Sequence, residues 1–318
     1  MSIISSDISK AIHFLTKGDI VAIPTETVYG LAGNIFLEDA INKIFDVKQR
    51  PRFNPLIVHL NNMNQVEDIV KEFPEKAQLL AKAFWPGPLT LILPKKSTVP
   101  DAVTAGKDTV AIRIPDHPVT LELLKQLPFP VAAPSANPFN RISPTKASHV
   151  NEYFEETIPM ILEGGECNRG IESTIIGFEN SKVIIYRLGS LELEKIEEIV
   201  GKVIVKNKKE SAPNAPGMLA KHYAPKTKII LVDDVKESIR TFHTHSIGVL
   251  KLTGESEMNQ VSKIELLSKS GNLTEAASNL YAALHNLDDA NLDLIIAERF
   301  PNYGLGKTIN DRLERATK

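Results

Sequence analysis

The stretch KQRPRFNPLIVHL, residues 48–60, joins a predicted helix over 38–48 to a short apolar strand. The same alternation of amphipathic and β-branched segments runs from IVAIP at residues 20–24 to TVAIRIP at 109–115. Strands that alternate with helices in this way are typical of an α/β fold. Farther along, the runs STIIGF and KVIIYRL are separated only by ENS, residues 179–181, which predicts an antiparallel hairpin and therefore a mixed sheet.

The length of 318 residues exceeds that of a usual single domain and suggests two. Residues 201–227 are rich in proline, glycine and lysine and show little apolar alternation, which is typical of a linker. After them, four apolar runs alternate with three predicted helices. We therefore expect a first α/β domain over residues 1–200, the linker over residues 201–227, and a small Rossmann-like three-layer α/β domain over residues 228–318.

Charge and cysteine content limit the kinds of site that the chain can hold. It has 37 basic and 39 acidic side chains, so no global field would attract a polyanion, and any anion site must be local. Cys167 is the only cysteine, which excludes an internal disulfide and a cysteine-rich zinc site and fits a reducing cytoplasm. No run approaches the roughly 18 apolar residues that span a bilayer, so we expect a cytoplasmic protein without a membrane role.

The opening stretch is the first candidate for such a local anion site. It carries Lys48, Arg50 and Arg52, and its two prolines stiffen the turn so that the basic side chains lose less freedom on binding. Arginine's planar fork suits phosphate or carboxylate oxygens, and Asn54 adds another donor. The alternative is an ordinary solvated charge run.

Five further segments have a composition that is unusual for sequence that only packs a core. PTETVYGLAGN, residues 24–34, places hydroxyls and glycines directly after a strand, as ligand sites at sheet edges do, although a polar turn would look similar. APSANPFNRISPT and EGGECNRGIESTI add more hydroxyls and glycines, and Arg187 ends a predicted strand. Ser135 does not lie in a G-x-S-x-G motif, and the sequence shows no evident general base for it. It is therefore better suited to hydrogen bonding with phosphate or ribose than to nucleophilic attack. Arg113 lies within an alternating strand, and by itself it favours a salt bridge with an acidic residue of the protein.

These segments together resemble the YrdC-type threonylcarbamoyl-AMP synthases. The motifs PTETVYGL, KQRP…NPLIVH, FWPGPLTLIL, TVAIRIPDHP, APSAN…SPT, EGG…G.EST, APGM…HYAP and GLGKTINDRLERA occur in the family's order and span nearly the whole chain. The tail after the linker is similar to that of the longer, two-domain branch of the family. The resemblance implies a YrdC-like twisted mixed sheet for the first domain.

The resemblance also implies a reaction. L-threonine, bicarbonate and ATP, usually with Mg²⁺, would give threonylcarbamoyl-AMP and pyrophosphate, the first step of threonylcarbamoyladenosine formation at tRNA position 37. The product would pass to a tRNA threonylcarbamoyl transferase machinery, and direct tRNA binding stays open. Catalysis of this kind depends mainly on positioning and charge neutralisation.

Carried over by motif, two groups of residues receive roles. The nucleotide would be held by Lys48, Arg50, Asn54, Thr109, Ser135, Ser143, Arg187 and Tyr223, with His222 beside it. The threonine pocket would be lined by Thr27, His59, Arg113, Ala133 and Ser173. Of these, the resemblance implies that Lys48, Arg50, Arg113 and Ser135 carry the catalysis, with Arg113 on the threonine carboxylate and the linker acting as a lid.

The chain departs from the family pattern at a few positions. Phe139 and Asn140 stand where a Ser-Gly pair is common, Leu188 stands where proline is usual, and Leu219 and Ala220 replace a more basic and aromatic pair in the linker.

Several other motifs and protein classes fit the sequence less well. GLGKT, residues 304–308, has Pro301 where a Walker A loop needs glycine, and His243 and His245 lack further metal ligands nearby, so neither predicts a site. An RNA-binding module without activity is disfavoured by the near-neutral charge and by the lack of an aromatic RNA-stacking motif. A carbamoyl-adenylate enzyme of hydrogenase maturation would need zinc modules that a chain with one cysteine cannot build.

Overall fold

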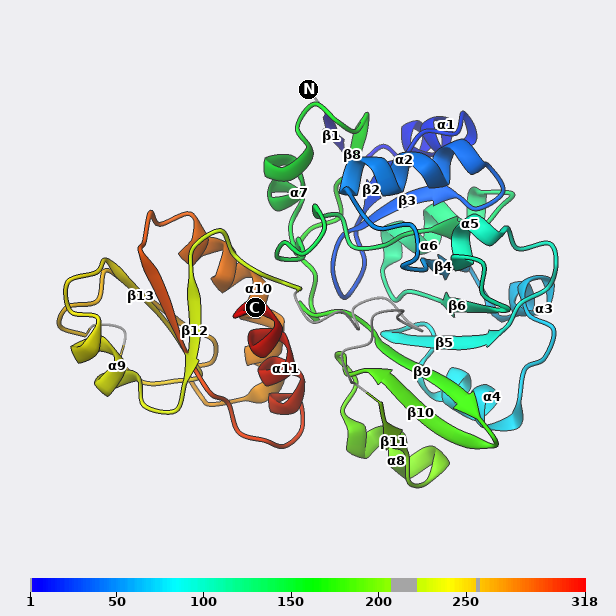
Figure 1. Cartoon of the computed structure of the whole chain (residues 1–318). Coiled ribbons are helices and arrows are strands. Elements are labelled where there is room, and N and C mark those ends of the chain that lie inside the picture. The colour runs from blue at the N-terminus through cyan, green and yellow to red at the C-terminus, as the bar shows by residue number, and fades with distance from the viewer. Residues whose placement is uncertain (1, 207–221, 256–257) are drawn as a thin grey trace.

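The protein folds around two separate sheets. A computed structural model describes residues 2–206, 222–255 and 258–318, and Figure 1 shows the two sheets side by side. Within the described residues, eleven strands form one mixed sheet in the order β1-β8-β2-β3-β7-β4-β6-β5-β9-β10-β11. Their bounds are β1 Ile3–Ser5, β2 Val21–Ile23, β3 Gly30–Asn34, β4 Ile57–His59, β5 Leu89–Pro94, β6 Thr109–Arg113, β7 Val131–Ala132, β8 Met160–Leu162, β9 Thr174–Glu179, β10 Lys182–Arg187 and β11 Ile204–Val205.

Helices cover both faces of this sheet. They are α1 Ile8–Thr16, α2 Glu38–Lys48, α3 Val66–Ile69 after the short 3₁₀ turn η1 Met63–Gln65, α4 Glu75–Phe84, α5 Asp101–Thr104, α6 Pro118–Gln126, α7 Ala147–Phe154 and α8 Leu193–Val200. Leu15 of α1 and Leu123 of α6 belong to one apolar core together with Met160. Ile41 of α2 and Leu80 of α4 belong to a larger core on the other side. The helix predicted over 38–48 is α2, and the α/β fold is confirmed.

Strand directions agree with the predicted hairpin. β9 and β10 pair antiparallel, with Phe178 opposite Val183, whereas β5 and β9 pair parallel. The sheet is therefore mixed, as the short ENS connection predicts. Leu188, the residue that stands where proline is usual, follows β10 directly.

The strand β3 was not predicted, because its sequence GLAGN is rich in small residues and lacks the β-branched pattern of a strand. It is nevertheless buried throughout and pairs antiparallel with both β2 and β7. The small residues are explained by close packing, since a Cβ on Gly30 would lie 3.1 Å from the Cβ of Ala133. This close approach brings the PTETVYGL segment against the segment that begins at Ala133.

The C-terminal part contains a parallel sheet of four strands in the order β12-β15-β13-β14 among the described residues. Its elements are β12 Ile229–Val232, α9 Val235–Thr241, β13 Ile247–Lys251, β14 Lys263–Leu266, α10 Leu273–Asp288, β15 Leu294–Glu298 and α11 Gly306–Ala316. One apolar cluster holds Ile239 of α9 with Ile296, and another holds Leu280 of α10 and Leu313 of α11 with Ile295. The three predicted layers are thus present.

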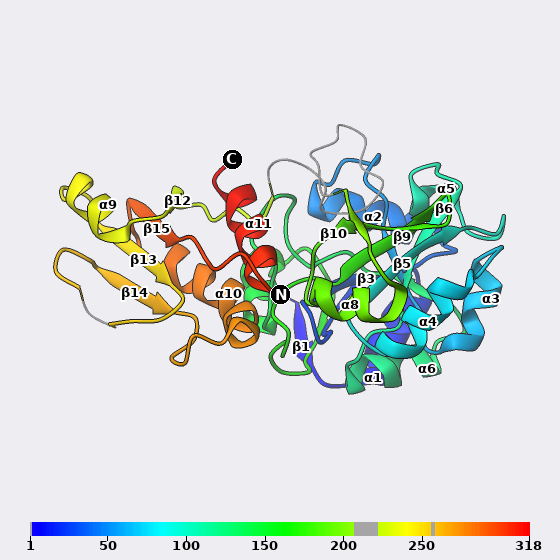
Figure 2. The same cartoon turned by 90° about the horizontal axis from the view of Figure 1, so that it is seen from below.

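The two sheets are joined through α10 and α11. Figures 1 and 2 show both helices lying between the four-stranded sheet and the first domain, while α9 lies on the far side. Of the predicted linker, only residues 201–206 and 222–227 are described, so Leu219 and Ala220 lie outside the described residues. No helix of the described residues has the length and apolar character needed to cross a membrane.

Candidate functional site

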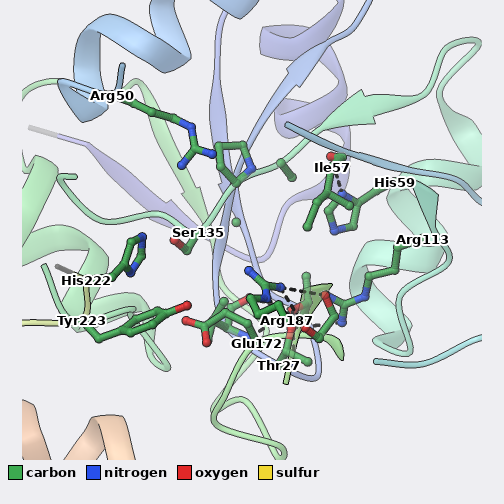
Figure 3. Close-up of a pocket in the computed structure, with 16 residues that line it drawn as sticks. Thr27, Arg50, Ile57, His59, Arg113, Ser135, Glu172, Arg187, His222 and Tyr223 are labelled. Atoms are coloured by element: carbon green, nitrogen blue, oxygen red, sulfur yellow. Dashed lines mark hydrogen bonds between the residues drawn. The ribbon is translucent and has the colours of Figure 1, made fainter. Parts of the chain in front are cut away.

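One pocket gathers most of the residues that the sequence singles out. Of the thirteen predicted site residues, nine line it: Thr27, Arg50, His59, Arg113, Ala133, Ser135, Ser173, Arg187 and Tyr223. His222 lines it as well. Figure 3 shows His59 and Arg113 on one side, His222 and Tyr223 on the other, and Ser135 between them. We call the two sides the Arg113 end (Thr27, His59 and Arg113) and the Arg50 end (Arg50, Arg187, His222 and Tyr223).

The Arg113 end is built by two parallel strands that finish together. β4 and β6 pair so that His59 lies opposite Arg113 at the last position of each strand. Because the carboxyl ends of parallel strands meet at one edge of a sheet, both side chains enter the same pocket. Burial, and then the charge of Arg113, lower the pKa of His59 to about 3. The imidazole is therefore neutral at physiological pH.

Arg113 makes the salt bridge that its strand alone favours. Its Nη2 atom lies 2.6 Å from Oε1 of Glu26, in a pair whose side chains are 5% and 2% exposed, and donates a hydrogen bond of 3.0 Å to Oγ1 of Thr27. Its Nε atom donates to the carbonyl of Gly87 at 3.3 Å. The guanidinium is held on three sides and still lines the pocket. Sequence reasoning did not single out Glu26, although it stands between two threonines in PTETVYGL.

The Arg50 end concentrates positive charge in a buried place. Arg50 donates to the carbonyls of Asn54 and Pro55 at 3.2 and 2.9 Å. These neutral partners do not balance its charge, and burial together with the nearby Arg187 lowers the pKa of Arg50 to about 9. Arg187 is buried too, which lowers its pKa, and it donates to the carbonyl and hydroxyl of Ser173. Repulsion between buried guanidiniums is relieved when an anion binds between them.

Lys48 lies directly behind this end. Its ammonium donates to the carbonyls of Ser135 and Asn137, and so ties the last residue of α2 to the loop that carries Ser135. Burial and the charge of Arg50 hold the pKa of Lys48 well below its usual value. Arg52 differs from its neighbours, because it points to the surface of α2, where it contacts Asn42 and lies 3.1 Å from Asp46.

Four predicted residues do not line the pocket. Lys48 and Ser143 lie behind it, with Ser143 Oγ donating to Glu172 at 2.6 Å, and Asn54 is fully buried with its amide unpaired among the described residues. Thr109 begins β6, so at about 3.3 Å per residue it lies roughly 13 Å from Arg113 at the other end. It lines a separate cavity with Phe178, so the structure does not bring it together with the residues of this pocket.

The linker returns to the pocket through His222 and Tyr223. Tyr223 is 1% exposed and has a φ of 64°, a left-handed conformation that is unusual for a bulky side chain. Such strain is found where the surroundings impose a conformation, commonly at functional sites. Asn140 also has a positive φ, 68°, and its carbonyl accepts from Ala224 at 2.8 Å. Asparagine tolerates this region, which explains how it replaces the glycine that is common there.

Glu172 is the second carboxylate that sequence reasoning missed. It lines the pocket, is 5% exposed, and accepts hydrogen bonds from Ser143, Tyr281 and Arg312. Burial alone would raise its pKa, but the charges of Arg312 and Arg187 and the bond from Ser143 hold the pKa below its usual value. Its place before Ser173 in the EST motif was the only signal in the sequence.

Comparison with known proteins agrees with the resemblance of the motifs. Residues 13–189 match the family described as "Telomere recombination", and residues 191–317 match "Threonylcarbamoyl-AMP synthase, C-terminal domain". The threonylcarbamoyl-AMP synthase of Pyrococcus abyssi is 40% identical over 96% of this chain and 93% of the relative, and that of Bacillus subtilis is 39% identical over 97% and 92%. The crystal structure of P. abyssi Sua5 complexed with L-threonine has a TM-score of 0.92 and 38% identity, and covers 99% of this chain and 98% of that chain. The chain therefore belongs to the threonylcarbamoyl-AMP synthase family.

Proposed function

We propose that the protein makes threonylcarbamoyl-AMP from L-threonine, bicarbonate and ATP, with release of pyrophosphate, in the pocket between the Arg113 end and the Arg50 end. The observation that carries this proposal is the pairing of two kinds of recognition in one buried space. At one end, the guanidinium of Arg113, held in place beside the neutral His59 and the hydroxyl of Thr27, suits the carboxylate and side chain of an amino acid. Two mutually repelling guanidiniums beside a tyrosine suit a nucleotide.

At the Arg113 end, we assign Thr27, His59, Arg113, Ser173 and the backbone of Ala133 to threonine. Arg113 offers a planar fork to the threonine carboxylate, and its contacts with Glu26 and Gly87 fix the direction of that fork. Because His59 is neutral, it can exchange hydrogen bonds with the threonine hydroxyl without adding charge. The amino group would then face the centre of the pocket, near Ser135.

At the Arg50 end, we assign Arg50, Ser135, Arg187 and Tyr223 to the nucleotide, with Lys48, Asn54 and Ser143 supporting them from behind. The threonine amine first takes up bicarbonate to form a carbamate, with loss of water. One carbamate oxygen then forms a bond to the α-phosphorus of ATP while the bond to the bridging oxygen of the β-phosphate breaks. Pyrophosphate leaves with that electron pair, and the buried cations stabilise the charge that develops.

Magnesium would enter this site with ATP. The described residues contain no group of three or more His, Cys, Asp or Glu side chains that could hold a metal ion. The pocket's own carboxylate, Glu172, is already paired with Arg312. The side chains present therefore do not fit a resident metal, and they suit Mg²⁺ only as a partner of the ATP phosphates.

The product is a mixed anhydride of a carbamate and a phosphate, which hydrolyses readily. We propose that a tRNA threonylcarbamoyl transferase machinery consumes it in the cytoplasm, which also fits the single buried thiol of Cys167.

The test is an assay of pyrophosphate release with each reactant omitted in turn. We expect release from ATP to require both L-threonine and bicarbonate, and the acid-quenched reaction to contain threonylcarbamoyl-AMP by mass spectrometry. Release at the same rate without threonine would refute the proposal.

A further inference from the structure

The carboxylate of Glu172 poses a problem for a pocket that binds a triphosphate. Glu172 lines the pocket directly beside the Arg50 end (Figure 3), and its pKa is held below the usual value, so it carries a negative charge. A bare carboxylate there would repel ATP and cancel the attraction of one guanidinium. Something must neutralise it without occupying the pocket.

The neutralising charge comes from the C-terminal domain. Nε of Arg312, on α11, donates to Oε2 of Glu172 at 3.0 Å, and the hydroxyl of Tyr281, on α10, donates to the same oxygen at 2.9 Å. The Arg312 side chain has an exposed fraction of 0%. α10 and α11 are the two helices that lie against the first domain (Figure 2), so an element distant in sequence completes the environment of Glu172.

The same guanidinium fixes two more parts of the pocket. Its Cζ atom lies 4.7 Å from the centre of the Tyr223 ring, in a cation–π contact. Its Nη2 donates to the carbonyl of Leu188 at 2.6 Å, just after Arg187. Because this partner is a main-chain carbonyl, the leucine that stands in place of proline provides it equally well. Asp311 holds the remaining side of the fork at 2.6 Å.

We propose that Arg312 is a positioning residue for ATP: the C-terminal domain supplies it to neutralise Glu172 and to hold Tyr223 against the nucleotide. This inference rests on the proposed function and gives the second domain a role in it. The pair is not needed merely to dock the domains. Arg141 with Asp288, and Ser278 with the carbonyl of Asn168, also join them. A buried ion pair adds little to stability compared with neutral groups of the same shape, so its presence beside the pocket points to a role in function.

The experiment uses the full-length Arg312→Met variant, which keeps bulk but removes the charge. We expect the Kd for a non-hydrolysable ATP analogue and the KM for ATP to rise about tenfold or more at pH 8, because Glu172 loses its ion-pair partner and keeps only the charge of Arg187 nearby. The KM for threonine should change less than about threefold, since the Arg113 end is untouched. Without its counter-charge Glu172 should also protonate more easily, so the loss of affinity relative to wild type should shrink as the pH falls from 8 to 6.

The double variant Glu172→Gln/Arg312→Met provides the rescue. It removes both charges, so its Kd for the analogue should recover most of the loss seen in Arg312→Met, with a remainder from the missing contact with the Tyr223 ring, and its ratio to wild type should not depend on pH. Arg299→Met is the matched control, because Arg299 pairs with Asp233 and Glu314 on the exposed surface of the same domain and should leave ATP affinity unchanged. If Arg312→Met alone is insoluble, Glu172→Gln provides the second measurement: it removes the carboxylate charge and leaves that of Arg312, so the Kd for the analogue should fall or stay within about threefold of wild type, and a tenfold rise would overturn the neutralising role.

The outcomes separate this inference from the proposed function. Unchanged analogue affinity in Arg312→Met at every pH would overturn the positioning role, and so would a soluble double variant whose affinity is as low as that of Arg312→Met, which would indicate a purely structural contact. These are binding measurements, so their interpretation does not depend on which reaction the wild-type protein catalyses. A wild type that binds the analogue but shows no threonine-dependent pyrophosphate release would refute the proposed function alone.

Discussion

Two different predictions apply to the side chain of Arg113. The alternating strand favours a salt bridge, and the family resemblance implies a contact with the threonine carboxylate. The structure contains the salt bridge to Glu26, while the guanidinium still lines the pocket. The internal partner stabilises the buried charge, and the contacts that the described residues make with the guanidinium use Nε and Nη2.

Arg113→Lys should therefore raise the KM for threonine more than the KM for ATP. One ammonium cannot reproduce the contacts with Glu26, Thr27 and a carboxylate together, so we expect the KM for threonine to rise about tenfold and that for ATP to change less than about threefold. Steady-state kinetics with each substrate varied would check this. Arg52→Lys, at an exposed pair with Asp46, should change neither value. Equal losses for both substrates in Arg113→Lys would contradict the assignment.

Arg50→Ala should show the opposite preference. Its guanidinium is buried beside Arg187 and, among the residues that the structure describes, donates only to main-chain carbonyls, so its loss removes attraction for phosphates and leaves the Arg113 end intact. We expect the Kd of the ATP analogue to rise about tenfold or more, with threonine binding little changed, as measured by titration calorimetry. An unchanged affinity for the analogue would remove Arg50 from the nucleotide site.

At the scale of elements, the site depends on loops that are packed as tightly as core. In the loop after β8, Gly170 has a φ of 65°, and a Cβ there would lie 1.9 Å from the carbonyl oxygen of Ser278 on α10. This loop continues directly into Glu172 and Ser173. Its glycine is therefore required both by backbone conformation and by the close approach of a helix from the other domain.

Gly170→Ala and Gly106→Ala form a matched pair that separates these two requirements. Both glycines have positive φ, but a Cβ on Gly106 would meet nothing within 4 Å. We expect Gly106→Ala to cost about 1 kcal/mol in free energy of unfolding and Gly170→Ala at least about 2 kcal/mol more, because α10 must move away. Denaturant titration would measure both, and similar losses would mean that the helix adapts without cost.

At the scale of the whole molecule, two buried histidines stack against each other at the interface between the two domains. The rings of His149 on α7 and His285 on α10 stack with centres 3.9 Å apart, and both side chains are buried. Burial and the neighbouring ring lower the pKa of His149 to about 3, and burial lowers that of His285 to about 4. The folded interface therefore disfavours protonation of either ring.

The sign of the resulting pH dependence follows from linkage. Both folded pKa values lie below the unfolded value of about 6.5, so between about pH 4 and 6.5 the unfolded chain binds protons that the folded chain does not. The free energy of unfolding should fall as the pH falls through this window. His285→Gln should reduce that slope by up to about 1.4 kcal/mol per pH unit, whereas His243→Gln, at an exposed position, should not. Denaturant titrations from pH 4.5 to 7.5 would check this, and an unchanged slope in His285→Gln would contradict it.

Local periodicity and motifs of fixed spacing were enough to predict the α/β class, the hairpin of β9 and β10, the family, and nine of the residues that line the pocket. They did not reveal β3, whose glycines and alanine serve close packing between strands. Thr109 and Arg113 lie four residues apart in one motif, but they stand at opposite ends of the extended strand β6. Only Arg113 therefore reaches the pocket.

The pairing of the buried charges could be seen only in the folded protein. Glu26 with Arg113, and Glu172 with Arg312, are pairs whose members are far apart in the chain and come from elements that no local pattern connects. Pairing of buried charges depends on distance in space and on the absence of water, and both arise only when the sheet and the two domains have packed. For that reason the motifs could indicate what the pocket binds, while the fold alone could show that α11 completes it.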